Sequence, residues 1–198
     1  KFSGTQGQQR IGVDLATSRQ REKARKYQTP HELVDPSGFL NVDTVTLQDL
    51  IGKKVILLDF WTYSCINCQR TIPHLNAWYD KYRDDGLEII GVHTPEFEFE
   101  KKYNNVKAAV DKFKIQYPVV QDNDYATWTA YNNHYWPHKY LIDIDGFIIY
   151  DHIGEGGYEE TERRIQAALR ERNDVLGIAS PVDTEIVNEK LAQSPAAE

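Results

Sequence analysis

The sequence contains no methionine and only two cysteines in 198 residues. It has no run of 18 apolar residues and no signal-peptide pattern, so no segment is expected to cross a bilayer. Two cysteines cannot build a disulfide scaffold in a chain this long, which excludes the class of small disulfide-stabilised domains. Because the first residue is Lys1 rather than methionine, we expect a processed or excised piece of a longer product.

The chain is also short of positive charge. It carries 23 Lys and Arg residues against 30 Asp and Glu residues, a formal net charge of -7. This balance gives no general case for nucleic-acid binding. Hydrophobic residues make up 40% of the chain, which is enough for a core. The length fits one medium domain with extensions, or two small domains.

The two cysteines lie three residues apart, where an apolar run ends and an amphipathic segment begins. The pattern predicts a strand, residues 55–60, that leads into a helix at Cys65. Side chains three apart in the first turn share one face, so the two sulfurs can meet. The helix start favours the thiolate of Cys65, and Cys68 is expected to be the shielded, resolving partner. A disulfide across so short a loop would stabilise the fold little, which indicates that the pair takes part in a reaction.

Hydrophobic periodicity predicts alternating strands and helices along the middle of the chain. Residues 55–92 are expected to form one βαβ unit with parallel strands, and Asp145-Gly146 is expected to turn a hairpin. Pro73 lies inside the first long helix and should kink it. The expected strands are 39–42, 55–60, 87–92, 117–120 and the two arms of 140–150, and the expected helices are 47–51, 65–82, 106–113, 126–131 and 158–169.

We divide the chain into an N-terminal extension (1–37), one domain (38–172) and a C-terminal tail (173–198). Residues 1–30 hold seven basic and two acidic side chains, and residues 18–28 could form a short charged helix. A solvated linker is the favoured interpretation of this segment, ahead of an arm that binds a partner or anionic lipid. Beyond residue 173 the periodicity fades, and residues 194–198 are expected to fray.

The order β-α-β-α, then a β-hairpin, then α, is that of the thioredoxin fold, with an extra strand and helix at 117–131. The expected class is therefore α/β, a central mixed sheet flanked by helices. Phe60-Trp61, Cys65-x-x-Cys68 and Pro73 resemble the TlpA/DsbE class of extracytoplasmic thioredoxin-like proteins. Four segments are similar, more narrowly, to the soluble domain of DipZ-type proteins: Trp-Thr-Tyr-Ser-Cys-Ile-Asn-Cys (61–68), Gly-Val-His-Thr-Pro-Glu (91–96), Tyr-Trp-Pro (135–137) and Gly-Glu-Gly (154–156).

This resemblance covers about two-thirds of the chain and implies a thiol–disulfide oxidoreductase that acts on protein substrates. It implies a location outside the cytoplasm, periplasmic or at the cell surface, tethered to or fused with a membrane protein. A membrane electron carrier of the CcdA kind is the partner it suggests, with no metal or cofactor. Ile66-Asn67 places no cation between the cysteines, which favours a reductant over a strong oxidant.

Asp59 interrupts an otherwise apolar strand six residues before Cys65. Burial would raise its pKa, and a proton acceptor near neutrality suits deprotonation of Cys68. Thioredoxin has a buried aspartate at this spacing, which supports the role. The alternative is that the side chain of Asp59 leans into solvent.

Four further residues are expected beside the sulfurs. Pro137 resembles the cis-proline of the family, which frees the backbone before it to pair with a substrate strand. A trans turn proline is the alternative. Trp136 would narrow the substrate groove, or simply pack. Trp61 and Tyr63 are expected to flank and shield the sulfurs as part of the substrate surface.

Three other functions compete with dithiol exchange. A zinc site would need further ligands such as His74, and a binding module could hold the pair as a static disulfide. A thiol peroxidase of the peroxiredoxin or glutathione-peroxidase type is the enzymatic alternative, since Thr62-x-x-Cys65 matches part of the peroxiredoxin motif. That motif also has proline where this chain has Leu58, and the nearby Cys68 favours the exchanger.

Overall fold

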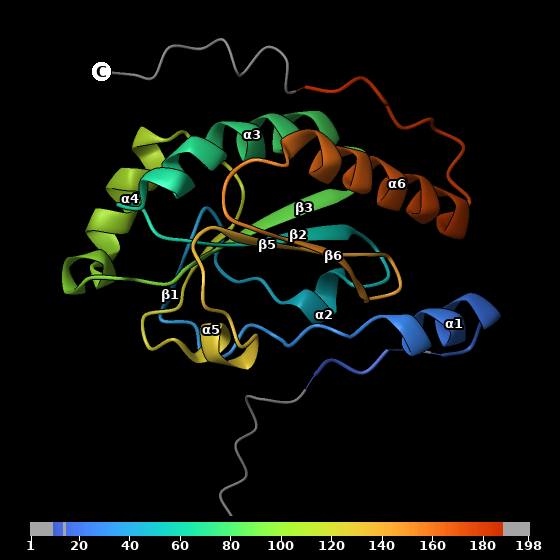
Figure 1. Ribbon diagram of the computed structural model, residues 1–198, viewed down its shortest axis with the longest axis horizontal. Helices are drawn as coiled ribbons and strands as arrows, with labels where there is room; N and C mark the ends of the chain where they lie inside the picture. Colours follow the sequence, from blue (N-terminus) through green and yellow to red (C-terminus); the bar gives the residue numbers. More distant parts are fainter. Residues whose placement is uncertain (1–9, 14, 188–198) are drawn as a thin grey trace, which may run out of the picture.

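The computed structural model describes residues 10–13 and 15–187 (Figure 1). Strands and helices alternate along most of the chain. They are α1 (Ser18–Lys26), β1 (Gly38–Leu40), α2 (Leu47–Leu50), β2 (Val55–Trp61), α3 (Ile66–Tyr82), β3 (Leu87–His93), the 3-10 helix η1 (Glu98–Lys101), α4 (Tyr103–Lys112), β4 (Val119–Gln121), α5 (Ala126–Ala130), β5 (His138–Ile142), β6 (Ile148–Ile153) and α6 (Tyr158–Leu176).

The strands form one mixed sheet in the order β1-β4-β3-β2-β5-β6. β2 pairs in parallel with β3 over its full length, from Val55 opposite Leu87 to Trp61 opposite His93. β5 and β6 form the antiparallel hairpin predicted around Asp145-Gly146, and β5 runs antiparallel to β2. The βαβ unit and the mixed α/β sheet are thus confirmed. The carboxyl end of β2 therefore lies beside the amino end of β5.

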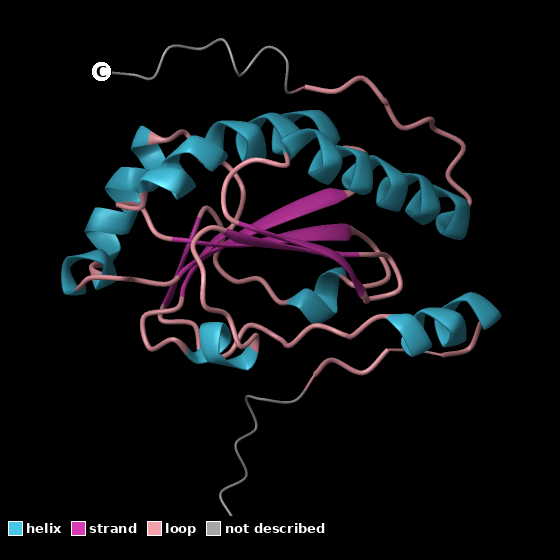
Figure 2. Ribbon diagram, in the orientation of Figure 1, coloured by secondary structure: helices cyan, strands magenta, loops and turns pink. Residues whose placement is uncertain are grey.

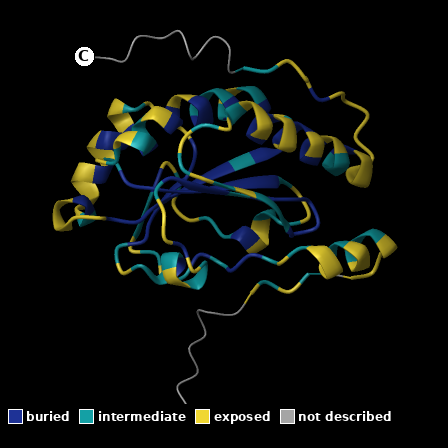
Figure 3. Ribbon diagram, viewed as in Figure 1, coloured by how far each residue is buried: buried dark blue, intermediate teal, exposed yellow. Residues whose placement is uncertain are grey.

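Helices cover both faces of this sheet. Figure 2 shows α3 and α6 over one face and α2 and α5 on the other, and Figure 3 shows the buried strands between them. Leu57 and Trp61 of β2 belong to the core under α3 and α6, while Ile56 and Leu58 belong to the opposite core. Because strand side chains alternate between faces, Asp59 points to the same side as Leu57, toward α3.

Two segments extend beyond the predicted boundaries. α6 continues to Leu176 and ends at Gly177, whose left-handed φ of 67° suits glycine. After it the chain packs back on the domain, where Val182 is only 8% exposed. The start of the tail at 173 was therefore placed too early, while residues 194–198 lie outside the described residues. The helix η1 was not predicted at all. α3 runs through Pro73, and its kink stays a prediction.

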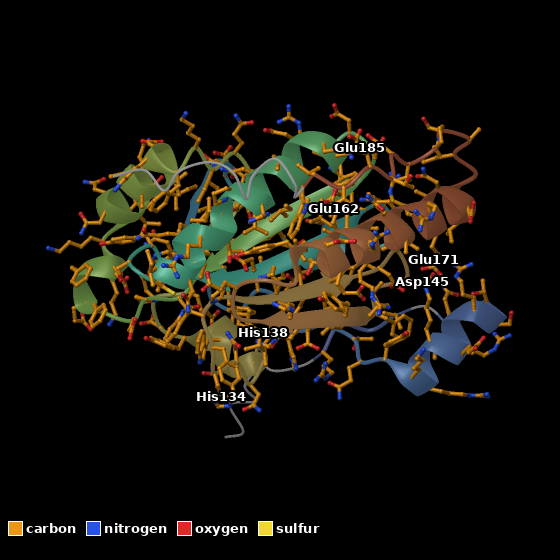
Figure 4. All side chains as sticks on the ribbon, turned by 45° about the horizontal axis from the view of Figure 1, so that its top comes forward. His134, His138, Asp145, Glu162, Glu171 and Glu185 are labelled. Atoms are coloured by element: carbon orange, nitrogen blue, oxygen red, sulfur yellow. The ribbon has the colours of Figure 1, made fainter. Side chains whose placement is uncertain are left out.

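The described part of the N-terminal extension is not the solvated linker that we expected. Lys23 of α1 contacts Asp143, Asp145 and Glu171 at 2.6, 2.8 and 2.7 Å, and Arg19 makes two bonds of 2.8 Å to Asp145. Figure 4 labels Asp145 and Glu171, which lie together beside α1. An isolated antiparallel bridge of Gln28 with Ile148 joins the extension to β6, and a second one, Arg10 with His31, lies within the extension.

Charge composition misled the prediction because the basic residues of α1 meet buried acids of the β5–β6 turn, far away in sequence. Within the described part of the chain, no helix combines the length and the hydrophobicity needed to cross a membrane.

Replacing Lys23 should therefore destabilise the protein. Lys23→Gln leaves the buried carboxylate of Asp143 without its cation, and we expect the free energy of unfolding to fall by about 2 kcal/mol at pH 7. Urea denaturation measures the change. Arg25→Gln on the exposed face of the same helix is the matched control, with an expected change within about 0.5 kcal/mol. Equal losses in both variants would contradict the assignment.

Candidate active site

The two cysteines lie where β2 leads into α3. Cys65 is the N-cap residue of α3 with extended backbone angles, φ -72° and ψ 117°, and Cys68 lies in the first turn. Both are free thiols, and they differ in exposure: Cys65 is half-buried, whereas Cys68 is 1% exposed. A substrate disulfide can therefore reach Cys65, whereas the buried Cys68 sulfur can react only with the Cys65 sulfur.

The surroundings of the two sulfurs separate their acidities. The Cys68 thiol, with the backbone N–H groups of Cys68 and Asn67, lowers the pKa of Cys65 to about 6 against partial burial and the charge of Glu96. Burial raises the pKa of Cys68, and the Cys65 thiol and Asp59 raise it further. Near neutral pH the pair thus holds a thiolate at Cys65 and a neutral thiol at Cys68.

Two buried charged residues lie under the cysteine pair. Asp59 is 2% exposed, and burial raises its pKa to about 7 although Lys139 lowers it. Asp59 and Lys139 are opposite each other in the β2–β5 register, so both point toward α3. Burial lowers the pKa of Lys139, which donates a hydrogen bond of 3.2 Å to the carbonyl of Gly154. The alternative orientation of Asp59, into solvent, is excluded by its burial.

Two further buried side chains hold the corner that precedes Cys65. His93 accepts the backbone N–H of Tyr63 at its Nε2 atom, 3.3 Å away, and the two rings stack with centroids 5.6 Å apart. Burial lowers the pKa of His93 to about 4, so its ring is neutral and can accept. Glu100 accepts bonds from the hydroxyl and the backbone N–H of Ser64. The entry to α3 is therefore fixed by β3 and η1.

The other wall of the site is the segment before β5. The Trp136–Pro137 peptide bond is cis, as predicted. The indole N–H of Trp136 donates to the carbonyl of Thr94 at 3.0 Å, and its ring packs on Trp128 with centroids 4.3 Å apart. The N–H of Gly154 donates to the carbonyl of Pro137 at 2.8 Å, which joins this wall to the loop before α6.

Trp61 departs from its expected place in the substrate surface. It is 1% exposed and lies edge-on to His93, beneath the corner, while Tyr63 reaches the surface. The indole fits because the neighbouring strand has Gly91, where an added Cβ atom would lie 2.8 Å from Trp61 Nε1. Trp61 therefore supports the site from below and does not contact a substrate.

Sequence reasoning missed Lys139, His93 and Glu100. Lys139 carries a visible signal, a cation in an apolar strand two residues after Pro137. His93 stands in the DipZ-like segment 91–96, but its contact with Tyr63, 30 residues earlier, has no local pattern. Glu100 carries no signal, because its partner Ser64 lies 36 residues earlier in the chain. Among the described residues no three His, Cys, Asp or Glu side chains are grouped so that they could hold a metal ion.

A mixed sheet with a reduced Cys-x-x-Cys pair at its first βα corner defines a thioredoxin-like protein of the dithiol type. The chain belongs to the AhpC/TSA family, whose model matches residues 35–151. It is 45% identical over 159 residues to protein DipZ of Mycobacterium tuberculosis, covering 79% of this chain and 23% of DipZ. The chain thus spans about a quarter of that relative.

A smaller relative matches over nearly its whole length. The thiol-disulfide oxidoreductase YkuV of Bacillus subtilis is 33% identical over 140 residues, which are 71% of this chain and 93% of YkuV. Among solved structures, a DsbE-type thiol:disulfide interchange protein from Chlorobium tepidum aligns with a TM-score of 0.64 at 25% identity, covering 73% of this chain and 97% of that one. The recognised fold and family are both confirmed.

The low pKa of Cys65 should depend on the hydrogen-bonding group at position 68. In the wild type, alkylation of Cys65 by iodoacetamide is expected to rise with pH around a midpoint near 6, with one adduct by mass spectrometry. Cys68→Ser keeps a donor and should keep a low midpoint. Cys68→Ala removes the donor and should raise the midpoint by about one unit or more. The same midpoint in both variants would show that the helix start alone sets this pKa.

Proposed function

We propose that this domain is a thiol–disulfide oxidoreductase that reduces disulfides of protein substrates through Cys65 and Cys68. The observation that carries the proposal is the pairing of a half-exposed thiol of pKa about 6 with a buried thiol in the same helical turn. The names of YkuV and of the DsbE-type structure support this class of activity. Without a cation between the cysteines, reduction of the substrate is the direction we favour.

In the first step the Cys65 thiolate attacks one sulfur of the substrate disulfide. A bond forms between Cys65 and that sulfur, and the substrate's other sulfur leaves as a thiolate. The positive end of the α3 dipole lies at Cys65 and stabilises the negative charge before the attack. Because Cys68 is buried, attack begins at Cys65.

In the second step Cys68 releases the substrate. Its thiol must lose a proton, and Asp59, with a pKa of about 7, is the acceptor. The Cys68 thiolate then attacks the Cys65 sulfur, and the substrate's second sulfur leaves as a thiolate. The protein is oxidised to a Cys65–Cys68 disulfide and the substrate disulfide is reduced to two thiols. Lys139 offsets the carboxylate charge of Asp59 before the transfer and the thiolate charge that develops on Cys68 after it.

The wall before β5 offers a place for the substrate backbone. The described residues provide no backbone hydrogen-bond partner for Trp136, and a substrate segment could pair there as an added strand. We also propose that the domain works outside the cytoplasm, coupled to a membrane electron carrier of the CcdA kind that returns the disulfide to the dithiol. The likeness to DipZ supports this arrangement.

Peroxide reduction is the competing function, because the AhpC/TSA family and Thr62-x-x-Cys65 both suggest it. The position of Thr62 argues against it. Its side chain is fully buried, and its hydroxyl lies 3.4 Å from His93 Nε2 inside the corner. This contact supports dithiol exchange over the peroxiredoxin motif, which needs that hydroxyl at the reacting sulfur.

A glutathione redox titration tests the proposed activity. The pair should titrate as one two-electron couple with a potential nearer the about -270 mV of thioredoxin than the about -120 mV of DsbA. Reduced Cys68→Ser should accumulate a mixed disulfide with native, disulfide-bonded insulin, seen on non-reducing gels, whereas reduced Cys65→Ser should form none. Peroxide consumption that persists in Cys68→Ser would favour the peroxidase, and a pair that dithiothreitol cannot reduce would favour a static bridge.

Asp59→Asn should slow the release step and leave the attack step intact. We expect decay of the mixed disulfide to be slower by at least about tenfold at pH 7.5, because the variant has no ionisable group at that position. In the wild type the release rate should rise as the pH passes about 7, and this step should vanish in the variant. Rapid-quench measurement of the mixed disulfide separates the two steps.

The stability of Asp59→Asn provides the control for folding. A carboxyl whose pKa is raised by folding lowers stability as the pH rises from about 4 to about 7, since the unfolded chain releases the proton first. The variant should therefore gain stability relative to wild type across that range, by about 1.4 kcal/mol per pKa unit. Asp80→Asn on the exposed face of α3 is the matched control and should change neither property. Unchanged release in Asp59→Asn would remove Asp59 from the mechanism.

A further inference from the structure

An aromatic ridge beside the reactive cysteine is exposed among the residues that the structure describes. It consists of Tyr63, Phe97 and Phe99. The two phenylalanines are 49% and 48% exposed and stack with ring centroids 5.4 Å apart and planes 9° apart. Phe99 also contacts Tyr63, with centroids 6.2 Å apart. Adjacent exposed aromatic rings are uncommon on a surface without a partner, and aromatic residues are enriched where proteins bind one another.

The ridge is held rigidly to the cysteine corner. The Glu100 carboxylate is fully buried and accepts the backbone N–H groups of Glu96 and Phe97 as well as the hydroxyl of Ser64. One buried side chain thus joins the turn that carries the phenylalanines to the residue before Cys65. A surface fixed in this way loses little conformational freedom on binding, which favours its use as a docking site.

The position of the ridge determines which molecule would cover it. Tyr63 lies two residues before Cys65, so a chain whose disulfide reaches that thiol must pass near the ridge or along the opposite wall. Ile66, the residue after Cys65, is also 55% exposed. Carboxylates of Glu96 and Glu98 alternate with the phenylalanines, and Glu98 is paired with Lys101 at 2.6 Å. An acidic segment would be repelled there.

We propose that the aromatic ridge binds an apolar side chain of the protein substrate, within a few residues of the cysteine that Cys65 attacks. The proposal rests on the proposed function and names its substrate class: disulfides whose cysteine is flanked by an apolar residue and not by acidic ones. The ridge extends the contact surface of the domain beyond the wall before β5, onto the turn between β3 and α4. Specificity then comes from η1, an element outside the cysteine helix.

Synthetic peptides test this assignment directly. Each peptide is a Gly/Ser chain with one cysteine, which forms a mixed disulfide with 2-nitro-5-thiobenzoate. Each member of the series has a single phenylalanine, at a different position within three residues of that cysteine. The reduced protein attacks the peptide sulfur and releases the coloured thiolate, which gives a second-order rate constant. We expect a phenylalanine at one or two positions to raise the rate about fivefold over the Gly/Ser parent, as an aromatic contact would.

The quantity compared is the rate constant of the phenylalanine peptide divided by that of the Gly/Ser parent. This ratio cancels any general change in the reactivity of Cys65. In Phe97→Ala and Phe99→Ala the ratio should fall toward one, and the double-mutant cycle between peptide and protein should be non-additive. Leu176→Ala removes an equally exposed apolar side chain, 42% exposed, at the far end of α6 and should keep the full ratio. Exchanging a neighbouring serine of the peptide for glutamate should lower the rate more than exchanging it for lysine.

Three results would overturn the assignment. One is a ratio near one for every peptide with the wild-type protein, and another is a full ratio retained in both phenylalanine variants. The third is a dimer in sedimentation equilibrium that Phe99→Ala dissociates, because the ridge would then be covered by a second copy of the chain. In each case the parent peptide still reacts with Cys65 if the proposed function holds, whereas loss of that reaction in the wild type would end the proposed function itself.

Discussion

The chemistry of this domain depends on the unequal hydration of two sulfur atoms that lie in one helical turn. Cys65, at the N-cap of α3, touches solvent, while Cys68 lies one turn deeper on the sheet. Burial raises the pKa of Cys68, and the donors around Cys65 lower its pKa to about 6. The same solvent gradient gives the pair an order of events, since one sulfur can meet a substrate and the other can meet only its neighbour.

The sheet maintains this arrangement at an energetic cost. Strand alternation places Asp59 and Lys139 on the face beneath α3, where both are almost fully buried. Burial opposes the charged form of each residue, raising the pKa of the acid and lowering that of the base. An apolar pair would suit the core better, and the proton transfer that we propose for Asp59 is what the chain would gain from these two residues.

The sequence predicts those parts of the site whose contacts join residues close together in the chain, and misses contacts between residues far apart in it. Cys65 and Cys68 belong to one strand–helix junction, and their spacing is sufficient to place them. The burial of Asp59 is expected from its apolar strand and from resemblance, with an orientation into solvent left open. Pro137 could be placed only through family resemblance. Glu100 lies in an alternation of Glu and Phe that has no helical period, and its partner Ser64 is 36 residues away. Lys23 was taken for a solvated charge for the same reason, because its acids lie 120 residues further on.

The two ends of the sheet carry different contacts. The β5–β6 turn, with Asp143 and Asp145, receives α1 and is the end away from Cys65, because β5 runs antiparallel to β2. The opposite end presents the cysteine corner, the cis-proline wall and the aromatic ridge. α6 spans both: Glu171 contacts Lys23 near its C-terminus, and Tyr158 lies 3.3 Å from the Thr71 hydroxyl at its start. Because α1 is held at the remote end, its ion pairs add stability without covering the surface that a disulfide must reach.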